Sequence, residues 1–132
     1  MEPKVNIMLI SHSRDIAKGL KALITQIAPT VPVLAIGGNR EGGLGTDMEM
    51  ISEALDGVRD QGHTLIFYDM GSAKMNADLV LELKGLQTVE IVEAPFVEGA
   101  YLAAVKASIG KTAQEIKLDL ERNFPNFLQT GE

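Results

Sequence analysis

The sequence predicts an α/β fold: a single doubly wound domain over residues 1–132, with a mainly parallel sheet of about four strands flanked by helices on both faces. Short apolar runs alternate along the chain with longer segments of helical periodicity, which is the pattern of β-α-β units joined by right-handed crossovers. The 132 residues are enough for one domain with a core and too few for two.

Four apolar runs have the length and composition of buried parallel strands. They span residues 5–10, 33–36, 64–68 and 89–92. The carboxyl ends of parallel strands meet at one edge of a sheet, where ligands and reacting groups collect in this class of fold. We therefore expect the loops after these strands to lie close together in space.

The segment between the first two strands predicts a helix with one apolar face, which Pro29 and Pro32 would end. The members of this face are Ile16, Leu20, Leu23, Ile24 and Ile27. For the second helix, Thr46 is the predicted N-cap, and Glu49 would complete a capping box. Its apolar face consists of Ile51, Ala54, Leu55 and Val58. Gly62 is expected to close it.

Three more helices are predicted in the second half of the chain. The third helix follows the third strand and ends at Gly85. Its apolar residues are Met75, Leu79, Val80 and Leu83. The fourth begins at Pro95 and is broken by Gly110. The fifth is capped by Thr112, with Glu115 at the box position.

The composition argues against several kinds of function. The absence of cysteine excludes a thiol nucleophile and a disulfide framework, and it fits a cytoplasmic location. No secretory signal is visible, and no apolar run approaches the ~20 residues needed to cross a bilayer, so no membrane partner is expected. The net charge of −6 argues against nucleic acid as the main partner. His12 and His63 are predicted at opposite edges of the sheet, which argues against a metal site.

The strongest candidate for chemistry is His12, which follows the first strand and so brings an imidazole to the carboxyl edge of the sheet. The turn after the third strand adds Asp69 and Ser72, and the second strand leads into a glycine-rich loop over residues 37–45. The helices that begin after these loops point the positive ends of their dipoles at the same edge. This combination favours an anion site, with phosphate as the expected ligand.

Each of these features also has an ordinary structural interpretation. A single histidine at a strand end is most often a structural or solvated residue. Asp69 could cap the following helix, as aspartate commonly does. The glycine-rich loop could be a flexible connector, because it matches neither the P-loop nor the G-x-G-x-x-G pattern.

Three stretches of the chain together resemble a known family. They are residues 10–20 (ISHSRDIAKGL), residues 37–47 (GGNREGGLGTD) and residues 68–76 (YDMGSAKMN). In this order and spacing, the chain resembles the phosphotransferase subunits (DhaM) of bacterial phosphoenolpyruvate (PEP)-dependent dihydroxyacetone kinases over about residues 4–124. The domain of that family is similar to the mannose-type EIIA domain of the sugar phosphotransferase system (PTS). The family commonly has leucine where Met70 stands, a conservative apolar difference.

The resemblance implies a phosphotransferase in which His12 accepts a phosphoryl group from the phosphocarrier protein HPr. His12 would pass the group to ADP on the nucleotide-binding subunit, and the resulting ATP would phosphorylate dihydroxyacetone on the substrate-binding subunit. The resemblance also implies a homodimer with no cofactor of its own, and Mg-ADP or Mg-ATP on the partner subunit. Some relatives continue into HPr-like and enzyme-I-like domains, whereas this chain stops at Glu132, so we expect the donor to be a separate protein.

The chemistry of a phosphohistidine suggests a role for each candidate residue. One ring nitrogen must present its lone pair, so the other should carry hydrogen and donate it to an acceptor. Asp69 is the candidate that orients His12 in this way. The phosphoryl oxygens need hydrogen-bond donors. The candidates for stabilising the phosphate are Ser13, Gly38, Thr46, Gly71 and Ser72.

Three other functions remain open. The first is a mannose-type sugar-permease EIIA domain with the same histidine chemistry, although Ser13 stands where that branch more often has glycine. The second is a non-enzymatic regulatory module that binds a small anion or nucleotide in the glycine-rich loop. The third is a phosphatase or mutase that uses a phosphohistidine, although Ser11 replaces the arginine of the mutase-type Arg-His-Gly motif.

Overall fold

The computed structural model describes residues 4–127, and its architecture confirms the predicted α/β fold. The strands are β1 (Val5–Ser11), β2 (Val33–Gly37), β3 (His63–Tyr68) and β4 (Val89–Ile91). The helices are α1 (Arg14–Ile27), α2 (Met48–Val58), α3 (Gly71–Lys84), α4 (Phe96–Ser108) and α5 (Ala113–Asn123). All strand pairs are parallel, in the order β2-β1-β3-β4. Each predicted strand is present, with ends that differ from the prediction by no more than one residue.

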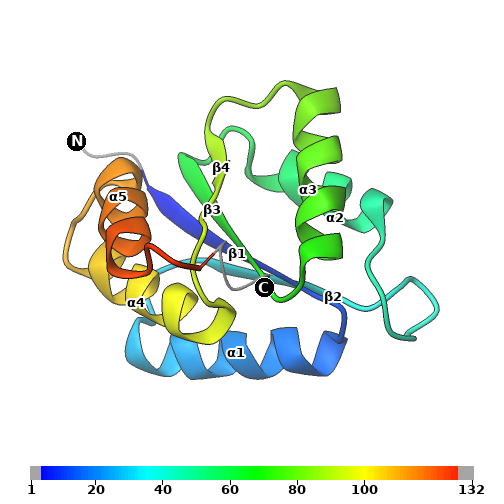
Figure 1. The fold of residues 1–132 in the computed structure, drawn as a ribbon, viewed down its shortest axis with the longest axis horizontal. Coiled ribbons are helices and arrows are strands. Elements are labelled where there is room, and N and C mark those ends of the chain that lie inside the picture. Colours follow the sequence, from blue (N-terminus) through cyan, green and yellow to red (C-terminus); the bar gives the residue numbers. More distant parts are fainter. Residues whose placement is uncertain (1–3, 128–132) are drawn as a thin grey trace.

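Helices cover both faces of the sheet, as the alternating pattern predicts (Figure 1). α1, α4 and α5 pack on one face, whereas α2 and α3 pack on the other. β1 lies between β2 and β3 and is buried along its whole length. Ile7 and Leu9 join the core beneath α1, α4 and α5, and Met8 and Ile10 join the core beneath α2 and α3. Burial on both faces explains why this strand is a continuous apolar run.

The register of the strands brings the predicted loops to one edge of the sheet. Ile10 of β1 pairs with Ile36 of β2 on one side and with Tyr68 of β3 on the other. β1 and β2 end one residue beyond this row, at Ser11 and Gly37, and β3 ends at Tyr68, so the residues after these strands leave the sheet at the same edge. His12 and Asp69 are among them, so the predicted convergence of the first and third loops is confirmed.

The predicted N-cap of α2 is wrong by one residue. The side chain of Asp47, not Thr46, accepts the backbone N–H groups of Glu49 and Met50, at 2.8 and 3.2 Å. Thr46 instead accepts a hydrogen bond from the side-chain amide of Asn76 on α3. Threonine and aspartate are both good N-caps, so the Thr-Asp pair does not reveal which of the two ends the loop.

Two other helix ends follow their local signals, whereas α2 ends at Val58, four residues before the predicted Gly62. The capping box of Thr112 and Glu115 at the start of α5 is present as predicted. α3 ends at Gly85, whose φ of +64° is the left-handed conformation that favours glycine. None of the helices within residues 4–127 is both long and apolar enough to cross a membrane.

The predicted apolar faces of α1 and α3 are wrong in part, because smaller residues face the sheet. On α1, Ala17 is buried beside Leu20 and Ile24. The side of α1 formed by the predicted core residues Ile16, Leu23 and Ile27 is about half exposed, at 52, 47 and 51%. On α3 the buried residues are Ala73, Ala77 and Val80, and the exposed ones are Met75, Leu79 and Leu83. A prediction from periodicity gives most weight to large apolar residues, whereas in α1 and α3 alanines are among the residues that pack against the sheet.

Gly99 marks a close approach between α4 and the core. A Cβ atom at this buried position would lie 2.8 Å from the Cβ of Ala94 and 3.4 Å from Cε2 of Phe67. We expect Gly99→Ala to lower the free energy of unfolding by about 1–3 kcal/mol, because a close-packed core resists overpacking. Gly57→Ala, at an exposed α2 position with nothing within 4 Å, is the control and should raise it by about 0.5–1 kcal/mol. Urea unfolding measures both; a Gly99→Ala variant as stable as wild type would contradict this packing.

Candidate functional site

His12 lies just beyond β1, and both nitrogens of its ring are hydrogen-bonded. Nδ1 is 3.0 Å from Oδ1 of Asp69, and Nε2 is 2.6 Å from Oγ of Ser72. The His12 side chain is 22% exposed, so the ring is held by the protein and still reaches solvent. The structure therefore brings together the predicted imidazole, the predicted carboxylate and one of the predicted hydroxyls.

Asp69 holds the backbone of His12 as well as its ring. Oδ2 of Asp69 accepts the His12 backbone N–H at 3.0 Å and the Ser11 hydroxyl at 2.8 Å. The backbone N–H of Asp69 donates to the carbonyl of Ile10 at 3.2 Å, which ties the start of this turn to β1. One carboxylate thus fixes the imidazole and the chain that carries it.

The surroundings of Asp69 keep its carboxyl group ionised. Burial acts to raise the pKa of Asp69, but hydrogen bonds from the His12 backbone, the His12 ring and the Ser11 hydroxyl outweigh it and lower the pKa below its usual value. An ionised carboxylate can only accept, so Nδ1 carries the ring hydrogen. In the neutral ring, Nε2 then has the lone pair and accepts the hydrogen of the Ser72 hydroxyl.

The first turn of α3 lies beside Nε2 of the ring. Ser72 is the second residue of α3, and the N-cap residue Met70 supplies no side-chain hydrogen bond. In contrast, α1 and α2 are capped by the side chains of Ser13 and Asp47. The amides at the start of α3, including that of Gly71, therefore lie at the positive end of a helix dipole without a side-chain cap, next to the ring.

The glycine-rich loop supports the backbone around His12. The N–H of Gly45 donates to the His12 carbonyl at 2.8 Å, and the N–H of Gly38 donates to the Ser11 carbonyl at 3.3 Å. Gly38 has a φ of +73°, and a Cβ there would lie 2.7 Å from the carbonyl oxygen of Gly43. The loop is thus fitted to the histidine segment by positions that favour glycine.

Two of the predicted phosphate ligands have structural partners. The Ser13 hydroxyl oxygen caps α1 by accepting the Ile16 N–H at 3.3 Å, and the Thr46 hydroxyl oxygen accepts the Asn76 amide. Within residues 4–127, neither hydroxyl is hydrogen-bonded to the His12 ring. Both hydroxyls act here as acceptors, so each keeps a hydrogen that it can donate.

Ser11 is a site residue that sequence analysis missed. Its side chain is fully buried, donates to Asp69 at 2.8 Å and accepts the backbone N–H of Ser13 at 3.0 Å. The signal that could have revealed it is a hydroxyl residue at the end of an otherwise apolar, doubly buried strand. Such a polar group needs a partner in the core, and the partner is the carboxylate that binds His12.

A second residue that sequence analysis missed is Glu93, which is hydrogen-bonded to both sides of the turn between β3 and α3. Its carboxylate accepts the Tyr68 hydroxyl at 3.0 Å and the Lys74 ammonium at 2.9 Å. Tyr68 directly precedes Asp69, and Lys74 follows Ser72 by two residues, so Glu93 binds both ends of the segment that supplies the partners of the ring. Burial, together with the Glu93 carboxylate, raises the pKa of Tyr68, which keeps its hydroxyl a donor.

Metal-ligating side chains do not gather in the part of the chain that the structure describes. No group of three or more histidine, cysteine, aspartate or glutamate side chains suited to a metal ion occurs there. His63 begins β3, and its N–H donates to the Lys4 carbonyl at 2.7 Å. It therefore lies at the edge of the sheet opposite His12, as predicted.

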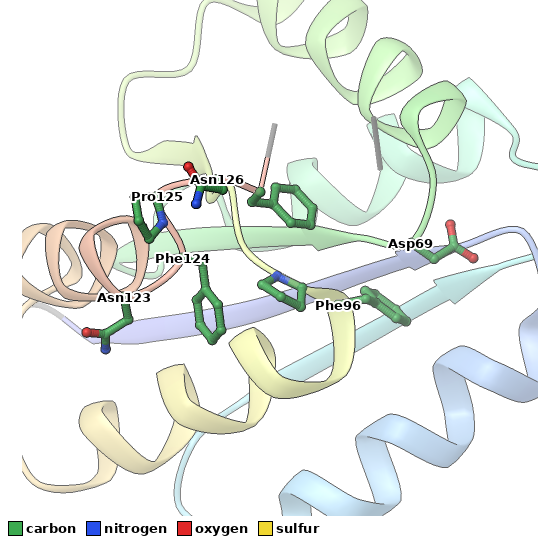
Figure 2. A pocket seen from close by; sticks show the side chains of 8 residues that line it. Asp69, Phe96, Asn123, Phe124, Pro125 and Asn126 are labelled. Carbon is green, nitrogen blue, oxygen red and sulfur yellow. The ribbon is translucent and has the colours of Figure 1, made fainter. Parts of the chain in front are cut away.

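A cavity of about 550 Å³ borders Asp69 on another side (Figure 2). Phe96, Phe124 and Phe127 line it, together with prolines and asparagines from the start of α4, the end of α5 and the segment after α5. Figure 2 shows the Asp69 carboxylate directed away from the labelled aromatic side chains. The carboxylate that binds His12 is thus turned out of this cavity.

Proteins of a known family match this chain over most of its length. The family model EIIA-man, described as the PTS system fructose IIA component, matches residues 6–117. The phosphotransferase subunit DhaM of the PTS-dependent dihydroxyacetone kinase of Lactococcus lactis is 39% identical over 116 residues, which cover 88% of this chain and 93% of that protein. A phosphoryl donor subunit DhaM of Listeria innocua PEP-dependent dihydroxyacetone kinase 1 is 34% identical, covering 92% of this chain and 96% of the relative. The Escherichia coli DhaM is longer: a match at 31% identity covers 87% of this chain but 26% of that protein.

Solved structures agree on the fold. A crystal structure of a protein of unknown function, EF1359, superposes with a TM-score of 0.82 at 30% identity, over 90% of this chain and 94% of that one. A sigma-54 interaction domain protein from Enterococcus faecalis has a TM-score of 0.74 at 16% identity, over 98% of this chain and 97% of that one, and this likeness shows the fold alone. The family model covers most of the chain, and full-length relatives exceed 30% identity, so the chain belongs to the EIIA-man family of PTS components.

Proposed function

We propose that this chain is a phosphohistidine carrier, a phosphotransferase component of a PEP-dependent dihydroxyacetone kinase. His12 accepts a phosphoryl group from HPr and passes it to ADP on the nucleotide-binding subunit. The observation that carries this proposal is the orientation of His12, with Nδ1 bound to Asp69 and Nε2 beside the start of α3. The relatives named as phosphotransferase or phosphoryl donor subunits support the same role.

Nε2 is the nitrogen that forms the bond to phosphorus. Its lone pair attacks the phosphorus of the donor phosphohistidine, and the donor N–P bond breaks with its electron pair returning to the donor ring. His12 loses no proton, because Nε2 carries none. Nδ1–H stays bonded to Asp69, whose negative charge stabilises the positive charge that develops on the ring. In the second transfer a terminal phosphate oxygen of ADP attacks the phosphorus, and the N–P bond of His12 breaks.

The phosphoryl oxygens are bound in this proposal by the first turn of α3. The amides of Gly71 and Ser72 lie at the positive end of the helix, and the Ser72 hydroxyl can turn its hydrogen from Nε2 to an oxygen. Ser13 and Thr46 have hydroxyl hydrogens that could reach further oxygens. The amide of Gly38 is already bonded, so its contribution is the close approach of the glycine-rich loop.

The carrier acts in the cytoplasm as a homodimer in this proposal, with its phosphoryl partners as separate proteins. The exposed side of α1 formed by Ile16, Leu23 and Ile27 offers apolar surface that a second copy could cover. The chain itself needs no cofactor for the transfer, and Mg-ADP or Mg-ATP is carried by the nucleotide-binding subunit.

In sedimentation equilibrium we expect about twice the 14.2 kDa mass of one chain, because the proposed carrier is a homodimer. A species of single-chain mass at micromolar concentration would contradict the homodimer.

A sugar-specific carrier is the second candidate, because the matching family model is described as a fructose IIA component. The chemistry at His12 is the same in both, and only the acceptor of the phosphoryl group differs. A phosphohistidine mutase has less support. Ser11 stands where its motif has arginine, and His63 lies at the far edge of the sheet, too distant to serve as the second acid.

We expect the wild-type chain, mixed with HPr, enzyme I and PEP, to gain one acid-labile phosphoryl group, because Nε2 of His12 is an oriented nucleophile. Intact-mass spectrometry measures the gain, and His12→Ala should show none. A His12→Ala variant labelled as well as wild type would show that the acceptor lies elsewhere. Adding both kinase subunits and dihydroxyacetone then tests the acceptor: phosphate that never reaches dihydroxyacetone would favour the sugar-specific carrier.

We expect Asp69→Asn to slow phosphorylation of His12 on the order of 10²–10⁴-fold, because an amide neither fixes the Nδ1–H tautomer nor balances the ring charge. Asp47→Asn is the matched control, since Asp47 likewise accepts backbone N–H groups, those of Glu49 and Met50, but caps α2 and does not bind the ring. Rapid-quench kinetics measures both variants, and circular dichroism checks their folding. Equal rates for the two variants would remove Asp69 from the mechanism.

A further inference from the structure

One flank of α1 carries a row of basic side chains that begins two residues after His12. Arg14, Lys18 and Lys21 lie within about 60° of one another around the helix axis, and all three are exposed. The buried residues of α1 separate this flank from the exposed apolar side of the helix, which Ile16, Leu23 and Ile27 form. α1 therefore presents two chemically different surfaces, and we call the row Arg14, Lys18 and Lys21 the basic flank.

The basic flank has no acidic partners in the described part of the chain. No carboxylate lies within ion-pair distance of its three side chains, whereas six other cations of the described chain form ion pairs. Examples are Lys74 with Glu93 at 2.9 Å and Lys117 with Glu121 at 2.7 Å. Acidic residues outnumber basic ones by 18 to 12, so neutralising neighbours are plentiful elsewhere. Three unpaired cations side by side form a local positive field on an acidic protein.

The flank borders a hollow beside the edge strand β2. Arg14 and Lys18 line this hollow of about 510 Å³. Arg40 and Glu53, which form an ion pair at 3.3 Å, line it as well. Arg14 also reaches the glycine-rich loop, since a Cβ at Gly42 would lie 3.4 Å from a guanidinium nitrogen. The basic flank thus begins beside the loop that supports His12, and its Arg14 and Lys18 face the hollow beside β2.

We propose that the basic flank docks a carboxylate-rich surface of a protein that exchanges the phosphoryl group with His12. This inference rests on the proposed function, because it assumes that a partner approaches that residue. The three charges extend over about 10 Å of helix, longer than one phosphate group, which favours an extended anionic surface. A second copy is a poor occupant at a two-fold axis, since the flank would meet its own positive charges.

The physical consequence is electrostatic steering. Opposite charges at the rim of an interface mainly raise the association rate and make it depend on salt. At an ionic strength of about 0.1 M such fields are screened over roughly 10 Å, which is the length of the flank itself. The flank should therefore act on the encounter with the partner and leave the chemistry at the ring unchanged.

The test compares two triple variants with the same change of charge. Arg14→Gln, Lys18→Gln and Lys21→Gln together remove the flank. Lys4→Gln, Lys111→Gln and Arg122→Gln remove three exposed, unpaired cations elsewhere on the protein. The second-order rates of both transfers, from phospho-HPr to His12 and from phospho-His12 to the ADP-loaded subunit, are measured at about 10 mM and about 500 mM salt.

We expect the flank variant to be slower than the control by about tenfold in at least one transfer at low salt, with the difference lost at high salt. Lys18→Glu alone should slow the same step more than Lys18→Gln, and these single exposed substitutions cover the case in which the triple variant fails to fold. Equal rates for flank and control variants in both transfers, or a defect that persists at high salt, would overturn the docking proposal. Absence of any label on the wild-type chain would instead overturn the proposed function.

Discussion

The hydrogen bonds between the Asp69 carboxylate and His12 are the interaction on which the rest of the site depends. One oxygen binds the ring at Nδ1, and the other binds the backbone N–H of the same residue and the hydroxyl of Ser11. Each of the two residues directly follows its strand, and the strands are paired neighbours in which Ile10 lies opposite Tyr68. Because the sheet is buried on both faces, these hydrogen bonds anchor the imidazole to a rigid part of the protein. They fix the tautomer of the ring and the direction of its free lone pair.

Asp69 can hold His12 only because it does not cap α3. Aspartate before a helix commonly caps it, and Asp47 does so for α2, but the α3 cap position is taken by Met70, which has no hydrogen-bonding side chain. The start of α3 keeps its amides for another acceptor as a result. The same turn thus provides an orienting carboxylate for one side of the ring and uncapped donors for the other. The Glu93 carboxylate binds residues on either side of that turn, Tyr68 and Lys74.

Those parts of the structure that depend on local or periodic signals could be predicted from the sequence. The apolar runs predict the buried strands to within one residue at each end, because burial on both faces leaves a continuous apolar run. The convergence of His12, Asp69 and Ser72 followed from the common edge of parallel strands. The partners of Ser11 and Glu93 could not be predicted, because the common edge brings these residues near one another but does not determine which side chains form hydrogen bonds. The exposure of Ile16 was missed for a related reason: periodicity identifies an apolar side of a helix but not how much of it the sheet can cover.

A carrier must release its phosphoryl group as readily as it receives it, and the distribution of positive charge fits that need. A lysine or arginine bound directly to the phosphoryl oxygens would stabilise the phosphorylated state itself and so slow the second transfer. Within residues 4–127, the side chains hydrogen-bonded to the ring are a carboxylate and a hydroxyl, and neither is a cation. Neutral donors at the start of α3 bind an anion less strongly than charged ones would. The cations stand apart on α1, where they can attract a partner without adding to the stability of the N–P bond.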